Sequence, residues 1–185
     1  MKAIDHPLPK RVLIDANFLV ALLSPKTGKD DRLKLDYFIK RLEEQKCHIV
    51  LAMPALAEFL VGADIAGVEA MNSLERKAYV IVASFDRAAA YECSLLDRAA
   101  IQGGTGDKRD GVEAPWQKVK FDRQIVAIGK ANNVQLVITG DKGVKAAALR
   151  CGMSAITVAD LPFSPDDAQQ KLNLPEPKSR PTTKP

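Results

Sequence analysis

The sequence predicts one α/β domain in which helices cover both faces of a parallel sheet. The chain has 185 residues, of which 46% are hydrophobic and 27% are charged, as is usual for a single globular domain. Segments with strand character alternate with segments of helical periodicity along the chain. One predicted strand, Val134–Ile138, is almost entirely apolar and β-branched, which is typical of a parallel strand buried on both faces. We expect residues 1–163 to form the domain and residues 164–185 to form a polar, proline-rich and disordered tail.

The first half of the chain supplies three predicted strands. Val12–Ile14 is a short apolar run that ends at Asp15, and the later strands are Cys47–Met53 and Tyr79–Ala83. The helices expected around them are Phe18–Leu23, Arg32–Lys46, Ala55–Ala63, Gly67–Lys77 and Phe85–Ala100. In the last of these helices we expect Ser84 to be the cap, Asp86 and Asp97 to be surface charges, and the inward side to hold Ala88, Tyr91, Leu95 and Ala99.

The second half begins with a polar, glycine-containing segment, Gln102–Lys120, which we expect to be a long loop. A helix should start at Phe121, with Asp122 in its first turn, and should end at the two asparagines before Val134. The strand Val134–Ile138 then stops at Thr139-Gly140-Asp141. The remaining expected elements are a helix over Lys142–Cys151, closed by Gly152, and a strand over Ser154–Ala159.

The overall charge and the cysteines restrict the class of protein only loosely. The formal charge of +4 includes +2 from the tail after Pro175, so it permits a nucleic-acid partner without arguing for one. Three cysteines far apart in the sequence fit a reduced, cytoplasmic protein better than a disulfide framework or a zinc site. The sequence shows no secretory signal and no apolar run long enough for a membrane span, so we expect no membrane association.

Four carboxylates are predicted to meet at one edge of the sheet. Asp15 and Asp141 follow strands, whereas Glu58 and Asp122 are expected in first turns of helices that begin at that edge. Right-handed crossovers bring the carboxyl ends of all the strands to this edge, where α/β proteins bind ligands. Each acid alone has an ordinary explanation, since acids cap helices and suit their N-termini. For Asp15 the sequence leaves the cap and the functional role equally open.

A group of four carboxylates needs a cation. Two unscreened charges about 4 Å apart repel by roughly 4 kcal/mol at an effective dielectric constant near 20. Hard divalent cations such as Mg²⁺ or Mn²⁺ prefer carboxylate oxygens as ligands. Zinc is not expected, because the two histidines, His6 and His48, lie near the terminus and before a strand. The sequence therefore predicts a Mg²⁺ or Mn²⁺ site formed by the four acids.

Four segments of the sequence resemble the PIN-domain family, and within it the VapC-type toxin ribonucleases. The segments are VLIDANFLVALL, MPALAEFL, YVIVASFDRAAAYECSLLDRAA and KFDRQIVAIGKANNVQLVITGD. The resemblance runs from about Arg11 to Ala159 and lies in the order of the segments and their flanking patterns, since no single motif is specific. The loop before Asp122 is longer than in the compact toxins, and the proline-rich tail is extra.

This resemblance implies a three-layer domain with a five-stranded parallel sheet and a metal-dependent endoribonuclease activity. By motif, the catalytic and metal-binding acids are Asp15, Glu58, Asp122 and Asp141. Asn17 and Thr139 match the accessory polar positions beside the first and fourth acids. Basic residues near the acids that could hold RNA phosphates are Lys118, Lys120, Arg123 and Lys142. RNA is the implied substrate, and a small antitoxin protein and a homodimer are open as partners.

Three other functions share part of this sequence pattern. A haloacid-dehalogenase-type phosphatase needs a second acid two residues after the first, where this chain has Asn17. A receiver-like signalling domain has no use for the pair Asp122 and Asp141. The serious alternative is a non-catalytic PIN module that binds RNA or a protein partner.

Overall fold

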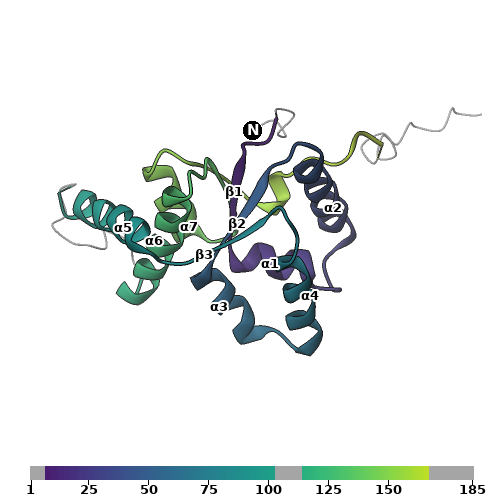
Figure 1. The fold of residues 1–185 in the computed structure, drawn as a ribbon, viewed down its shortest axis with the longest axis horizontal. Helices are drawn as coiled ribbons and strands as arrows, with labels where there is room; N and C mark the ends of the chain where they lie inside the picture. The colour runs from purple at the N-terminus through teal and green to yellow at the C-terminus, as the bar shows by residue number, and fades with distance from the viewer. Residues whose placement is uncertain (1–6, 103–113, 167–185) are drawn as a thin grey trace, which may run out of the picture.

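The computed structural model describes residues 7–102 and 114–166, and its centre is a five-stranded, all-parallel sheet (Figure 1). The strands lie in the order β3-β2-β1-β4-β5. Their bounds are β1 Arg11–Ile14, β2 His48–Ala52, β3 Val80–Ala83, β4 Leu136–Ile138 and β5 Ser154–Ile156. All five predicted strands are therefore present; β1 begins one residue earlier than expected, and the other four are somewhat shorter. The fold class is confirmed.

Helices cover both faces of the sheet and form its outer layers. Their bounds are α1 Ala16–Leu23, α2 Lys29–Glu44, α3 Met53–Gly62, α4 Ile65–Glu75, α5 Arg87–Ala100, α6 Trp116–Ala131 and α7 Lys142–Arg150, with a 3₁₀ turn at Val158–Asp160. In the view of Figure 1, α5, α6 and α7 lie together to the left of the strands, whereas α2 lies to the right. None of the helices in the described part of the chain is long and apolar enough to cross a membrane.

The core forms where the helical layers meet β1, the central strand. Val12, Leu13 and Ile14 are fully buried, as is expected for a strand covered on both faces. On one side, α6 passes so close to the strand that a Cβ on Gly129 would lie 3.0 Å from the Leu13 side chain. Glycine at this position therefore sets the separation between helix and sheet.

The strand order places a topological switch point at the centre of the sheet. Beta strand β1 pairs with β2 on one side and with β4 on the other, with Ile14 opposite Ile138. Strands β2 and β3 therefore lie on one side of β1, whereas the later strands β4 and β5 lie on its other side. In open α/β sheets, ligands bind beyond the carboxyl ends of the strands at such a point.

The start of α6 differs from the sequence prediction. The helix begins at Trp116, so Lys118 and Lys120 belong to it rather than to a loop. The polar composition of this first turn concealed its helical periodicity, although Val119 is buried. Asp122 consequently lies in the second turn of α6, and Glu58 likewise lies in the second turn of α3, so neither is in the first turn of its helix.

The inward face of α5 is also displaced from the prediction. The predicted face is exposed, with 66% of Tyr91 and 42% of Leu95 accessible to solvent, while Ala89 and Cys93 face the core. Small residues on the buried side allow α5 to pack closely against α6. The cap of α5 is Asp86, whose side chain accepts a hydrogen bond from the Ala89 amide, so Ser84 is not the cap.

Two predicted segments lie partly outside the described residues. Residues 103–113 of the predicted loop and residues 167–185 of the predicted tail are not described. The domain boundary near residue 163 therefore stays a prediction.

Candidate active site

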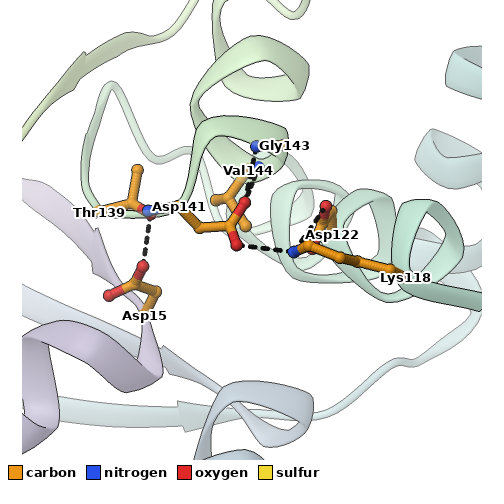
Figure 2. Close-up of polar contacts among 7 residues, drawn as sticks. All are labelled: Asp15, Lys118, Asp122, Thr139, Asp141, Gly143 and Val144. Atoms are coloured by element: carbon orange, nitrogen blue, oxygen red, sulfur yellow. Dashed lines mark hydrogen bonds and ion pairs between the residues drawn. The ribbon is translucent and has the colours of Figure 1, made fainter. Parts of the chain in front are cut away.

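Asp15 lies between β1 and α1, and each of its carboxylate oxygens has a different partner. Oδ1 accepts a hydrogen bond from the Phe18 amide at 2.8 Å and so caps α1. Oδ2 accepts a hydrogen bond from the hydroxyl of Thr139, which follows β4 (Figure 2). The side chain is buried, with 3% of its residue surface exposed. The two roles that the sequence left open for Asp15 are thus compatible, because the cap uses only one oxygen.

Thr139 connects β1 and β4, the two strands at the switch point. Its hydroxyl donates to Asp15 and accepts a hydrogen bond from the Asp141 amide at 2.9 Å. Its own amide donates to the Ile156 carbonyl at 2.8 Å, which extends the sheet by one residue. The threonine is 1% exposed, so its contacts are fixed by the surrounding core. It therefore holds the two aspartates in a defined relation across the switch point.

Asp141 repeats the arrangement of Asp15 at the start of α7. Its Oδ1 accepts hydrogen bonds from the amides of Gly143 at 2.6 Å and Val144 at 3.2 Å, which caps the helix. Its Oδ2 accepts a hydrogen bond from the Lys118 ammonium at 2.6 Å. Both strand-end aspartates therefore use one oxygen to start a helix and direct the other to a partner outside it.

Asp122 reaches the same place from α6. Its Oδ1 and Oδ2 lie 3.4 Å and 3.5 Å from the Lys118 ammonium, so one lysine contacts two acids (Figure 2). The residue is 8% exposed, and Lys118 lies one helical turn before it on the accessible side. Asp122, Asp141 and Lys118 together form an ionic triad beside the switch point.

Gly143 makes room for the carboxylate of Asp122. A Cβ at residue 143 would lie 2.0 Å from Asp122 Oδ2 and 3.1 Å from Asp141 Oδ1, closer than real contacts allow. Gly143 is not among the site residues predicted from the sequence. Its signal was a glycine in the first turn of a helix, where glycine is unfavourable unless something requires it.

The pKa values of the two triad acids move in opposite directions. Burial, the charge of Asp141 and the charge of Glu58 raise the pKa of Asp122 above its ordinary value, against the opposing effect of Lys118. Burial also acts to raise the pKa of Asp141, but Lys118 and the amides of Val144 and Gly143 outweigh it and lower the pKa. The shorter contact of Lys118 with Asp141 explains this difference, because the ammonium stabilises that carboxylate most. Of these two acids, Asp122 therefore has the charge that its neighbours compensate less.

Lys118 responds in the opposite sense. Burial acts to lower its pKa, but the hydrogen bond to Asp141 and the charges of Asp122 and Asp141 raise it above the ordinary value. The ammonium is therefore held in its charged form by the two acids.

Glu58 and Asn17 lie at the margin of the site. Glu58 is exposed on α3, and its charge acts on Asp122 without a direct contact between the two. Asn17 is exposed on α1 beside Gly140, since a Cβ on Gly140 would lie 3.8 Å from the Asn17 Cβ. Within residues 7–102 and 114–166, no three histidine, cysteine, aspartate or glutamate side chains are placed together as a metal-binding group. The structure thus pairs Asp122 with Asp141 and links Asp141 to Asp15 through Thr139, but it leaves Glu58 apart.

Arg123, which the sequence offered as a contact for RNA phosphates, is buried rather than exposed. It is 4% exposed, and its guanidinium donates to Asp97 of α5 at 2.7 Å. Asp97 is therefore a structural partner and not a simple surface charge. Lys120 and Lys142 are exposed, and Lys142 lines a small cavity of about 130 Å³ beside Asp122 and Gly143. These two lysines are the remaining candidates for phosphate contacts outside the triad.

Comparison with solved structures identifies the fold. A chain in the crystal structure of VapBC2 from Rickettsia felis bound to a DNA fragment from their promoter aligns with 80% of this chain and 98% of its own length, with a TM-score of 0.56 and 12% identity. VapC20 of Mycobacterium tuberculosis, a Sarcin-Ricin loop cleaving toxin, aligns with 74% of this chain and 94% of its own length, with a TM-score of 0.48 and 18% identity. No protein-family model and no curated protein matches the sequence. The first likeness confirms the PIN-like fold expected from the sequence.

Proposed function

We propose that this PIN-like protein is a metal-dependent endoribonuclease that hydrolyses RNA phosphodiester bonds. The observation that carries the proposal is the meeting of Asp122 and Asp141 at the switch point of the sheet, where Thr139 ties Asp141 to the buried Asp15. Buried carboxylates of like charge are unfavourable unless a cation compensates them. A site of this kind at a sheet edge is suited to a divalent cation and a phosphate.

The donor set fits a hard divalent cation. The residues that would hold Mg²⁺ or Mn²⁺ are Asp15, Glu58, Asp122 and Asp141, all of which offer oxygen ligands. That two of these carboxylates already share the Lys118 ammonium supports the fit, because it shows that the pair accepts a cation. When bound, the metal ion would polarise the scissile phosphate and make hydroxide available near neutral pH.

The protein itself supplies position and charge. Thr139 fixes the direction of the Asp15 carboxylate, and Gly143 leaves space for that of Asp122. Lys120 and Lys142 are exposed beside the acids and would offset their repulsion of an RNA backbone. Asn17 is near enough to the loop after β4 to orient a water molecule or a phosphate oxygen.

The proposal is tested by cleavage of labelled RNA with Mn²⁺, with Mg²⁺ and with EDTA. We expect Asp15→Asn and Asp122→Asn each to abolish cleavage while the circular dichroism spectrum stays that of the wild type. Mn²⁺ at a hundredfold excess over Kd should stabilise the wild type by about 2.7 kcal/mol and the variants much less. Wild-type cleavage by either variant would show that the four acids are not the metal site. An intact fold that binds RNA but never cuts it would favour the alternative, a non-catalytic PIN module.

We further propose that the protein is the toxin of a toxin–antitoxin pair that acts in the cytoplasm. A groove of about 290 Å³ lies between α1 and the α3–α4 segment, lined by the apolar Val20, Phe59 and Ala66 and by the polar Ser24, Lys26 and Asp64. Beside it, Val61 is 91% exposed and Ile65 is 80% exposed, and exposed apolar side chains that are grouped together mark surfaces that bind partners. An apolar segment of a small antitoxin would cover this surface. Co-expression with the product of a small neighbouring reading frame should give a complex, and Val61→Lys should weaken it.

A further inference from the structure

The triad contains a cation that belongs to the protein. The ammonium of Lys118 lies 2.6 Å from Asp141 Oδ2 and 3.4 Å from Asp122 Oδ1 (Figure 2). Helical geometry produces this position, because residues four apart on α6 lie on the same side of the helix. The side chain is 49% exposed, so the ammonium lies at the mouth of the site rather than within the core.

A bound metal ion and this ammonium would need the same oxygens. Asp141 Oδ1 is already occupied by the amides of Gly143 and Val144, so Oδ2 is the oxygen of Asp141 that is directed at the site. Lys118 donates its shortest hydrogen bond to that oxygen. A divalent ion placed beside the ammonium would also meet the repulsion of a like charge at short range.

We propose that Lys118 is the resident counter-cation of the metal-free site and that a divalent cation binds by displacing its ammonium from Asp141. The inference rests on the proposed metal-dependent function. Lys118 is then a residue that sets metal affinity: its charge keeps the two carboxylates together without metal and weakens the binding of metal. Its substitution should therefore tighten metal binding, unlike substitution of a ligand.

Displacement is feasible because the ammonium of Lys118 is held by few contacts. Within residues 7–102 and 114–166, its hydrogen bonds are those to Asp122 and Asp141. Half of the side chain faces solvent, so the ammonium can leave the oxygens without opening the core. Surface ion pairs of this exposure exchange readily with competing ions.

The test measures binding of Mn²⁺ alone, without RNA, by electron paramagnetic resonance of the free ion. Lys118→Met retains the length of the side chain and removes its charge, and Lys118→Arg retains the charge. Lys130→Met removes one charge from an exposed position in the last turn of the same helix and is the matched control. Asp122→Asn reports whether the ion binds at this site.

We expect Lys118→Met to lower the Kd for Mn²⁺ by roughly tenfold to a hundredfold, which is the size of one charge-assisted hydrogen bond removed from competition. Lys130→Met and Lys118→Arg should bind Mn²⁺ within about threefold of the wild type. Without metal, Lys118→Met should have a lower Tm than the wild type, and saturating Mn²⁺ should remove the difference. If Lys118→Met folds poorly, Lys118→Gln provides the same comparison.

Two results would overturn the inference, and they can be told apart. Equal or weaker Mn²⁺ binding by Lys118→Met and Lys118→Gln, with tight binding that depends on Asp122 in the wild type, would remove the competition and leave the proposed function intact. Absence of Mn²⁺ binding in every variant and in the wild type would overturn the proposed function together with the inference.

Discussion

Replacement of Gly143 by alanine tests whether the backbone of α7 shapes the acidic site. The added Cβ would start 2.0 Å from Asp122 Oδ2, whereas real Cβ contacts are essentially never closer than 3.0 Å. The carboxylate must therefore retreat by about 1 Å or the helix must shift. A misplacement of about 1 Å at a reacting centre can lower the rate by roughly 10²-fold. We expect RNA cleavage by Gly143→Ala to fall by about that factor.

Two effects on stability oppose each other in this variant. Alanine is favoured over glycine within a helix by about 1 kcal/mol, and overpacking of a filled position costs about 1–3 kcal/mol. The net change in the free energy of unfolding is therefore small, and a double-mutant cycle separates the two contributions. In an Asp122→Ala background the clash is absent, so Gly143→Ala should stabilise the protein. The coupling energy between the two sites should be about 1–3 kcal/mol.

The cycle is measured by urea unfolding in EDTA, so that metal binding does not contribute. Gly62→Ala is the matched control, because it lies in a helix and a Cβ there would meet no atom within 4 Å. Its effect should be the same with and without Asp122. The reasoning is refuted if Gly143→Ala changes stability equally in both backgrounds, since the carboxylate would then not occupy the space that the glycine leaves.

Two further predictions concern the same acids. Thr139→Val keeps the shape of the side chain but leaves Asp15 Oδ2 without its donor and the Asp141 amide without its acceptor. It should lower the free energy of unfolding by about 1–3 kcal/mol and reduce cleavage more than Thr139→Ser does. Equal activity of the two variants would contradict the positioning role of Thr139. Because the pKa of Asp122 is raised in the folded state, its ionised form lowers the stability of the fold. This destabilisation is fully present above the folded pKa and disappears as the pH falls through that pKa towards the ordinary value of 3.8. Without metal, the Tm of Asp122→Asn relative to the wild type should therefore rise from about pH 4 to pH 7, and a constant difference would show that the carboxylate is not strained.

The strands and the acids that follow them could be predicted, because a buried strand is recognisable from a run of consecutive apolar residues. A parallel strand covered on both faces needs an apolar residue at almost every position, and Val12–Ile14 shows this directly. The end of α6 was also predictable, because asparagine tolerates the left-handed conformation, and Asn133 has a φ of 56°. Gly152, with a φ of 74°, likewise ends α7 as expected.

The helical faces were harder to predict, because several residues can satisfy the same periodicity. In α5, the set containing Tyr91 and Leu95 is more apolar than the set containing Ala89 and Cys93, yet close packing on α6 selects the smaller side chains. In α6, the buried face includes Asp122, so its first turns read as polar. Tertiary packing decided both cases.

The internal cation and the glycine beside it depend on distances between elements. Lys118 lies 23 residues from Asp141 in the sequence, and nothing in its local pattern distinguishes it from an exposed lysine. The position of Gly143 against Asp122 likewise arises from how α6 and α7 approach each other. Such contacts follow only once the strand order is known.

The hydrogen bond between Asp15 and Thr139 joins residues that are 124 positions apart, and this separation has a consequence for protein synthesis. At about 5–20 residues per second, a ribosome needs roughly 6–25 s to progress from the first partner to the second. A nascent chain that carries only β1, β2 and β3 has neither Asp122 nor Asp141. Under the proposed function, a nascent chain therefore has no complete acidic site until Asp141 has been synthesised, and we expect a product that terminates before Thr139 not to cleave RNA.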